Sequence, residues 1–213
     1  MKKLNKKIKT NRGMTYVELI VVLSIFSVLS SVAIFNYGDF QARVDIKNLA
    51  SDIAIKIVEA QKASLGGALP LSFAQQSTDP NWKPSYGIHI TSNATLDIAG
   101  ANDKNFIYFT DIDSDKLFTG DGPNCNGECL DYISITKGEY IEKIEKVLGN
   151  AYTPIANTDA LTITFTRPDA SAVFSDSLGI LSGFDYVKIT LSSANQRVKA
   201  SIRIYPSGRI QID

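Results

Sequence analysis

Hydrophobic and polar positions divide the chain into three zones. The run from Leu19 to Phe35 is almost wholly apolar, and the zone that follows mixes apolar and charged residues at helical spacing. From Tyr86 onward the pattern changes to short alternating runs. At 1.5 Å rise per residue, the apolar run spans roughly 26 Å as a helix, at the short end for crossing a bilayer. The pattern predicts an α+β protein in which a long helix precedes a β-rich part.

The second zone predicts a helix with one apolar face. Apolar residues recur there at spacings of four or five, and charged residues fill most of the gaps. The apolar positions are Phe40, Val44, Leu49, Ala50, Ile53, Ala54, Ile57 and Val58. The Gly66-Gly67 pair, with Pro70 just after it, predicts the end of the helix. A continuous helix from Met14 would be roughly 78 Å long, so we expect residues 19–35 to protrude and the later part to pack on the β-rich part.

Runs rich in β-branched and aromatic residues predict the strands. They cover residues 86–91, 105–110, 132–136, 161–166, 187–191, 200–205 and 209–212. Pro206-Ser207-Gly208 predicts a hairpin turn between the last two. Residues 140–148 fit a helix or a strand, and their β-rich surroundings favour a strand. Residues 66–85 contain three prolines and predict a loop.

Charge separates a basic N-terminus from an acidic remainder. Residues 1–13 hold six basic residues and no acid, so residues 14–213 carry a net charge of about −6. This balance does not predict a nucleic-acid clamp, which needs a basic face, although it leaves local basic patches open. A basic stretch before an apolar run is the layout of an export signal or membrane anchor. The positive-inside rule then places the C-terminal part outside the cytoplasm.

Glu18 is the unusual residue of this region, because it lies at the start of the apolar run. A carboxylate drawn toward the bilayer centre costs about 2–3 kcal/mol, so it needs a partner, and a free α-amine is a good one. Two ordinary alternatives stay open. One is a conventional secretory signal, for which Ser31-Val32-Ala33 offers a cleavage site of the small-x-small type, and the other is a simple one-helix anchor. Neither gives Glu18 or the Gly13 junction a role.

The segment Gly13-Met14-Thr15-Tyr16-Val17-Glu18-Leu19, with its basic leader and apolar run, resembles the class III signal of type IV prepilins and pseudopilins. The resemblance implies a precursor that prepilin peptidase cuts after Gly13. It implies N-methylation of the new first residue, Met14, where the family more often has Phe. It also implies that Glu18 pairs with the N-terminus of a neighbouring subunit during assembly.

The C-terminal third is similar to minor pseudopilins of the FimT/GspH type. The similarity lies in the stretches Leu161-Thr162-Ile163-Thr164-Phe165 and Arg203-Ile204-Tyr205-Pro206-Ser207-Gly208-Arg209-Ile210. Those proteins have a long helix against two small β-sheets and end in a hairpin of this form. The fold implied is α+β, with a long protruding N-terminal helix packed on a C-terminal antiparallel β-sheet or β-sandwich domain.

The organisation that follows has four parts. Residues 1–13 form a cleaved leader peptide, and residues 14–35 form the transmembrane or filament-core half of the helix. Residues 36–65 form its amphipathic half, and residues 66–213 form the β-rich globular domain. The family implies a single-pass membrane protein with an extracytoplasmic C-terminal domain, located in a pilus or pseudopilus at the cell surface.

Asp111, Asp113 and Asp115 place three carboxylates at a spacing of two. They share a face of an extended chain or converge in a turn, and oxygen ligands of this kind suit Ca²⁺. Further carboxylates nearby are Asp121, Glu128 and Asp131. The pattern is not an EF-hand, because the glycine and final glutamate of that loop are missing. Several pseudopilins hold calcium in an Asp-rich loop of this kind, so we expect Asp111, Asp113, Asp115 and Asp121 as ligands, with a solvated acidic turn as the alternative.

Cys125 and Cys129 lie close together in a polar loop. With an export signal before them, they predict a disulfide that closes a small ring. A metal site is disfavoured, because only His89 could join them and zinc usually takes four ligands. His89 has the parity of Gly87 in a predicted strand, so we expect it on the outer face of that strand and not in catalysis.

The leading interpretation is a structural, non-enzymatic subunit: a minor pilin or pseudopilin of a type IV pilus, a competence pilus or a type II secretion machine. Its expected partners are prepilin peptidase, other pilin subunits, the inner-membrane assembly platform and the membrane, with no nucleic acid. The alternative is an adhesive or DNA-capturing pilin that acts through its globular tip. It requires an exposed basic or aromatic patch, which the acidic balance does not favour. A membrane-tethered enzyme requires a convergent polar pocket, and the sequence contains no nucleophile elbow, P-loop or dinucleotide fingerprint.

Overall fold

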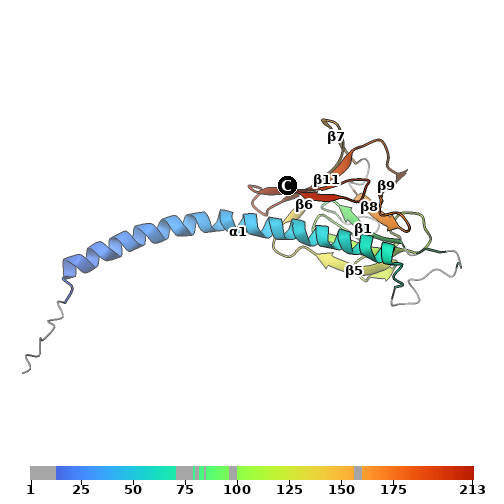
Figure 1. Cartoon of the computed structure of the whole chain (residues 1–213). Helices are drawn as coiled ribbons and strands as arrows, with labels where there is room; N and C mark the ends of the chain where they lie inside the picture. Colours follow the sequence, from blue (N-terminus) through green and yellow to red (C-terminus); the bar gives the residue numbers. More distant parts are fainter. Residues whose placement is uncertain (1–12, 71–78, 80–81, 84, 96–99, 156–159) are drawn as a thin grey trace, which may run out of the picture. The chain divides into compact units, whose positions relative to one another are not determined.

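The computed structural model describes residues 13–70, 79, 82–83, 85–95, 100–155 and 160–213. The basic leader up to residue 12 and most of the loop predicted before residue 85 lie outside the described residues. The chain divides into two units, residues 1–40 and 41–213. One helix, α1 (Tyr16–Gly66), contributes residues to both units, and the strands described all belong to the second (Figure 1). A long N-terminal helix with an antiparallel β-rich domain confirms the predicted α+β fold class.

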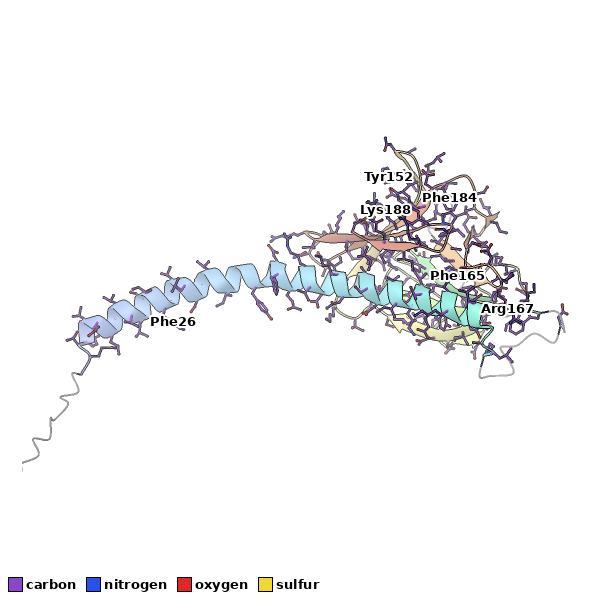
Figure 2. The ribbon with its side chains drawn as sticks, in the orientation of Figure 1. Phe26, Tyr152, Phe165, Arg167, Phe184 and Lys188 are labelled. Carbon is purple, nitrogen blue, oxygen red and sulfur yellow. A yellow bond between two sulfur atoms is a disulfide. The ribbon has the colours of Figure 1, made fainter. Side chains whose placement is uncertain are left out.

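Among the described side chains of α1 in the first unit, none of the large apolar ones is buried, Phe26 included (Figure 2). From Leu19 to Ile34 these side chains are between 46% and 73% exposed. Within the described residues, α1 is long and apolar enough to span a bilayer.

The part of α1 in the second unit has one fully buried face. Its buried apolar residues are Ile46, Ala50, Ile53, Ile57 and Ala60, each at most 1% exposed. Their alternating spacing of four and three keeps them on one side of a helix with 3.6 residues per turn. Val44 and the last residue of the first unit, Phe40, which the sequence places on the apolar face, are 37% and 63% exposed. That assignment was wrong, because spacings of four and five drift around the helix.

The end of α1 is set by its two glycines, as predicted. Gly67 has a φ of 59°, in the left-handed region. The N–H of Gly67 donates to the carbonyl of Ser64 and the N–H of Ala68 donates to that of Ala63, both at 3.0 Å. These bonds satisfy carbonyls of the last turn in a Schellman-type cap, which glycine adopts without steric cost.

The strands form two main sheets, and their pairings are all antiparallel. The six-stranded sheet has the order β10-β9-β8-β1-β2-β5, and the five-stranded sheet has the order β13-β12-β11-β6-β7. The strands of the six-stranded sheet are β1 (Ser85–Thr91), β2 (Asn105–Asp111), β5 (Cys129–Ser134), β8 (Ala160–Thr166), β9 (Ala172–Asp176) and β10 (Gly179–Ile180). The strands of the five-stranded sheet are β6 (Tyr140–Leu148), β7 (Ala151–Pro154), β11 (Tyr186–Ser192), β12 (Lys199–Ile204) and β13 (Ile210–Ile212). A separate small pair consists of β3 (Gly120–Asp121) and β4 (Asn126–Gly127).

Both sheets pack with α1 into one main hydrophobic core. From the six-stranded sheet it contains Ile88, Phe106, Leu161, Ile163 and Phe165, and from the five-stranded sheet Ile144, Val187, Ile189, Ile202 and Ile204. A second, smaller core holds Ala101, Ile107, Phe109, Phe118 and Cys129. Alternate β2 residues enter different cores, so the six-stranded sheet is buried on both faces.

The strand predictions were mostly confirmed. Residues 140–148 form a strand, β6, and the turn at residues 206–208 joins β12 to β13. The strand predicted at residues 132–136 lies earlier, at Cys129–Ser134. Strands β3, β4, β7, β9 and β10 were missed, because they are short and several lie at sheet edges, where burial does not impose a clear alternation.

Candidate functional sites

The predicted processing junction lies directly before α1. Met14 is 63% exposed, and a Cβ placed on Gly13 would meet no atom within 4 Å. Gly13 and Met14 belong to no helix or strand. The described part of this junction is therefore accessible to a peptidase.

The backbone of Glu18 also takes part in the helix cap, which the sequence analysis did not predict. The backbone N–H of Glu18 donates to Thr15 Oγ1 at 3.3 Å, and the N–H of Leu19 donates to the carbonyl of Thr15 at 3.1 Å. Thr15 with Glu18 three residues later is the capping-box signature, which was visible in the sequence. An acid in the first turn also complements the positive end of the helix dipole. A test of the Glu18 charge must therefore use a residue that also suits this position of a capping box.

Three of the four predicted metal ligands come together. One carboxylate oxygen from each of Asp111, Asp113 and Asp115 lies within 4.8 Å of the others. Asp111 ends β2 and is fully buried, whereas Asp113 and Asp115 are exposed in the following loop. Asp121 is not part of this group, and its carboxylate accepts a hydrogen bond from the side chain of Asn124.

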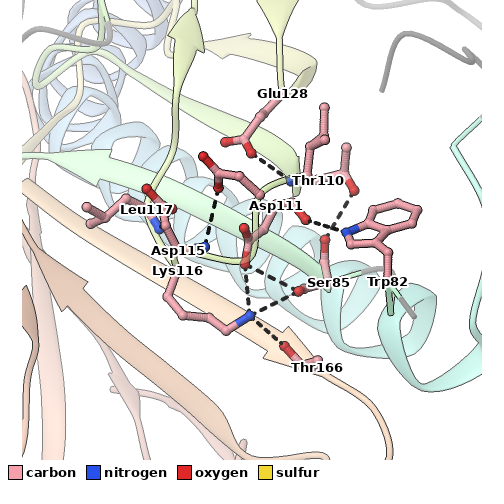
Figure 3. Close-up of polar contacts among 11 residues, drawn as sticks. Trp82, Ser85, Thr110, Asp111, Asp115, Lys116, Leu117, Glu128 and Thr166 are labelled. Carbon is pink, nitrogen blue, oxygen red and sulfur yellow. Dashed lines mark hydrogen bonds and ion pairs between the residues drawn. The ribbon is translucent and has the colours of Figure 1, made fainter. Parts of the chain in front are cut away.

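Asp111 is the buried centre of a polar network (Figure 3). Lys116 Nζ lies 2.9 Å from Asp111 Oδ2 and also donates to Ser85 Oγ and Thr166 Oγ1, both at 3.2 Å. Ser85 Oγ in turn lies 3.3 Å from the same carboxylate oxygen. The other oxygen, Asp111 Oδ1, is buried and has no hydrogen-bond partner among the described residues. Lys116 thus neutralises one side of this carboxylate and leaves the other able to bind a cation.

Glu128 holds the far side of the loop. Its carboxylate accepts hydrogen bonds from the N–H of Ile112 at 2.6 Å and from that of Thr119 at 2.8 Å. Burial raises the pKa of Glu128 to about 7, with help from the charges of Asp111 and Asp113. Burial also raises the pKa of Asp115. The negative charge of this loop therefore depends on pH in the neutral range.

The predicted disulfide is confirmed. Cys125 and Cys129 are bonded, and Cys129 is fully buried in the smaller core. The bridge closes a short ring at the start of β5, directly beside Glu128.

His89 lies on the strand face that its parity predicts, but that face is covered. Its ring is 5.7 Å from that of Phe118, and its Nδ1 lies 3.0 Å from Thr162 Oγ1. Only 8% of His89 is exposed, because the loop that carries Phe118 covers this face. The residue is thus a satisfied part of the packing.

Comparison with known proteins supports a pilin-type protein in general. The chain is 30% identical over 103 residues to two proteins named "Fimbrial protein" from Pseudomonas aeruginosa. The similarity covers 48% of this chain and 62% of each relative, so the chain spans less than two thirds of their length. No protein-family model matches the chain. No solved structure matches it.

Proposed function

We propose that this chain is a structural subunit of a filament of the type IV pilin class. One observation carries the proposal: the apolar side chains from Leu19 to Ile34 are 46–73% exposed. A surface this apolar requires a bilayer or other subunits around it. The similarity to fimbrial proteins supports the same role.

The assembly chemistry follows from the first residues of the mature chain. Cleavage after Gly13 creates a cationic amine at Met14, which methylation preserves as a cation. Apolar helices gain little by leaving lipid for one another, so packing alone sets their register poorly. A pair between Glu18 of one subunit and the amine of the next supplies that register. The contact joins two different surfaces, so it propagates into a filament rather than closing into a ring.

Within this class, we favour a minor pseudopilin of the FimT/GspH type. Support comes from the two sheets that share a core with α1 and from the terminal hairpin, in which the N–H of Tyr205 donates to the carbonyl of Arg209 at 2.9 Å. The machine is a type IV pilus, a competence pilus or a type II secretion pseudopilus. Its prepilin peptidase and inner-membrane platform are the expected partners.

Intact-mass analysis of the membrane form tests the processing step. We expect a chain of residues 14–213 carrying one added methyl group. Gly13→Val should leave the full precursor, whereas Gly38→Ala should be processed normally, because a Cβ at Gly38 meets no atom within 4 Å. A mature chain that starts at Ile34, after Ala33, would show a conventional secretory signal, and an uncut wild-type chain would show a simple anchor. Either result contradicts the proposal.

We also propose that the loop after β2 binds Ca²⁺ through Asp111, Asp113 and Asp115. The donor set fits the ion, because it consists of carboxylate oxygens, and one oxygen of Asp111, Oδ1, is buried without a partner among the described residues. A bound Ca²⁺ would offset the repulsion between these carboxylates and hold the loop over the smaller core. Lys116 already neutralises one oxygen of Asp111, so the remaining charge favours moderate affinity.

Thermal unfolding in calcium and in chelator tests the calcium site. At a calcium concentration 100 times the Kd, binding stabilises the fold by about 2.7 kcal/mol. Asp113→Ala should remove this gain, and Asp121→Ala should retain it, because Asp121 lies outside the cluster. An equal Tm in calcium and in chelator would contradict the calcium site and support the alternative, a solvated acidic turn.

A further inference from the structure

A small pocket lies between α1 and the end of β5. We call it the acidic pocket, and its volume is about 130 Å³. Its acidic side chains are Asp45 and Asp52 from α1 and Glu139, the residue before β6. Its apolar side chains are Leu49, Phe106, Ile133 and Ile135. Asp45, Leu49 and Asp52 share one face of α1, because their spacings of four and three follow the helical period.

Glu139 is buried in this pocket without a partner. Only 5% of the residue is exposed, and within the described part of the chain its carboxylate forms no hydrogen bond or ion pair. A carboxylate removed from water without a compensating partner destabilises a fold. Exceptions of this kind are expected at functional sites. Glu139 therefore indicates that the pocket takes a cationic ligand.

The acidic pocket contains more acid than base. Lys137 Nζ lies 2.6 Å from Asp45 Oδ1, and Gln41 Nε2 donates to the other oxygen of Asp45 at 2.9 Å. Asp45 is thereby satisfied, whereas Asp52, like Glu139, has no such partner in the described ranges. The pKa of Lys137 is raised, first by its hydrogen bond with Asp45 and further by the charges of the three acids. Three acids and one lysine line the pocket, so its net charge is −2.

The arrangement of the carboxylates favours an organic cation over a metal ion. Among the described residues, the carboxylate oxygens that converge within 4.8 Å as a group of three are those of Asp111, Asp113 and Asp115. The carboxylates of the acidic pocket do not converge in this way, as the oxygen ligands of a metal ion must. The apolar side chains of the pocket suit an alkyl chain, as they would the aliphatic part of a lysine.

We propose that the acidic pocket binds a small aliphatic diamine or polyamine. One ammonium would pair with Glu139 inside the pocket, and a second would pair with Asp52, which is exposed and therefore lies at the rim. The alkyl chain between them would contact Leu49 and Ile135. The pocket volume of about 130 Å³ is roughly four times the share of one water molecule in the liquid, so it admits a short alkyl chain.

The charge of the pocket distinguishes this ligand from other cations. A lysine side chain from another protein would supply one ammonium and leave one of the two carboxylates unpaired. An inorganic dication would leave the apolar side chains without a contact. The inference goes beyond the filament role, because the pocket lies within the second unit and uses neither the processing junction nor Glu18.

Methyl NMR of the full chain in a non-ionic detergent tests the proposal, with labelled isoleucine methyl groups and 1,4-diaminobutane as the probe. At constant ionic strength we expect saturable shifts of the Ile133 and Ile135 signals. The signal of Ile180, which is exposed on β10, should not move. Neutral 1,4-butanediol should cause no such shifts, and n-butylammonium should bind more weakly because it carries one charge.

Variants of the two unpaired acids give the second part of the test. Glu139→Gln keeps the shape of the side chain and removes its charge, so we expect at least about tenfold weaker binding. Asp52→Asn should weaken binding about two- to fivefold, since an exposed ion pair contributes little. Because Asp52 is exposed, this variant keeps the test valid even if Glu139→Gln fails to fold. Glu59→Gln, which changes an acid of the same helix outside the pocket, should bind like the wild type.

Four outcomes would overturn the proposal. The first is the absence of shifts in a wild-type chain that melts normally. The second is equal shifts with magnesium chloride, which would show general screening of acids. The third is n-butylammonium binding as tight as that of the diamine and unaffected by Asp52→Asn, which would assign the pocket to a single ammonium such as a lysine side chain of another subunit. The fourth is a folded Glu139→Gln chain that binds the diamine like the wild type. None of these outcomes bears on the filament role, which depends on Gly13 and Glu18.

Discussion

The two parts of α1 are both rich in apolar residues, yet they have opposite environments. Between Leu19 and Ile34 the large apolar side chains are 46–73% exposed, whereas Ile46, Ile53 and Ile57 are at most 1% exposed. The difference lies in the spacing of charge. The first part has no charge between Glu18 and Asp39, while the second part has charged residues on its outer face. A helix with one apolar stripe suits packing on a protein core, whereas a helix that is apolar all round suits contact with lipid or other helices.

The largest contrast should come from truncating one isoleucine in each part. Ile53→Ala opens a cavity in the main core, so we expect a loss of about 2–5 kcal/mol in the free energy of unfolding of the second unit. Ile25→Ala, whose side chain is 56% exposed, should leave that free energy unchanged. Thermal or denaturant unfolding in detergent measures both. Equal losses would show that the two parts of α1 contribute alike to the stability of the fold, contrary to their difference in burial.

The disulfide should matter only to the second unit. By the loop-entropy estimate, a ring of about five residues stabilises the fold by roughly 2 kcal/mol. We expect the double variant Cys125→Ser with Cys129→Ser to lose this stabilisation, seen as a lower Tm, and to insert in the membrane as the wild type does. Unfolding curves and membrane fractionation of the double variant measure the two effects. A variant that also failed to insert would show that insertion of the first unit depends on the fold of the second.

The end of α1 offers a smaller contrast between two adjacent glycines. Gly67→Ala forces a side chain into a φ of 59° and brings its Cβ against Arg167 Nη1, so we expect a loss of about 1–2 kcal/mol in the free energy of unfolding. Gly66 is helical, and a Cβ added there meets no atom within 4 Å. We therefore expect Gly66→Ala to be neutral or slightly stabilising. Unfolding curves of the two variants compare them directly, and a similar loss in both would exclude the cap as the cause.

The pH response of the acidic loop should be the smallest effect. The pKa of Glu128 is raised to about 7 in the folded chain, so the folded state retains this proton to a higher pH than the unfolded state. The contribution of Glu128 to the free energy of unfolding is therefore fully present below about pH 4.5 and is lost as the pH rises through 7. In chelator we expect the Tm to fall by about 2–4 °C over that range, equivalent to about 1 kcal/mol after solvent screening. Glu128→Gln should flatten the response, and an unchanged slope in that variant would assign it to other groups.

Much of the fold was predictable because local rules and burial agree. The Gly66-Gly67 stop, the turn at Pro206-Ser207-Gly208 and the long strands follow from backbone preference and alternation. The set of α1 residues that is buried could not be predicted, because Ile46 and Phe40 are equally apolar and only packing selects between them. Short edge strands such as β7 carry too little pattern to be recognised.

The candidate sites were predictable where the residues are neighbours in sequence. The Gly13 junction, Glu18, the Asp111–Asp115 cluster and the disulfide could all be named in advance. The sequence could not exclude Asp121 from the cluster, since its distance from the other carboxylates depends on the fold of the loop. The grouping of Tyr152, Tyr186 and Tyr205 could not be predicted either, because these residues lie in β7, in β11 and just after β12, and only the sheet register brings them together.

We infer that the charge of Glu18, and not its place in the helix cap, assembles the subunit into a filament. Glu18→Gln tests it most directly, because glutamine can still serve in the capping box while the charge is removed. Asp52→Asn is the matched control, since it removes an exposed acid from the same helix. We predict that Glu18→Gln is cleaved, inserts in the membrane and keeps the Tm of the second unit, yet is absent from sheared filaments that contain Asp52→Asn. Recovery of Glu18→Gln in those filaments at the wild-type level would contradict the account.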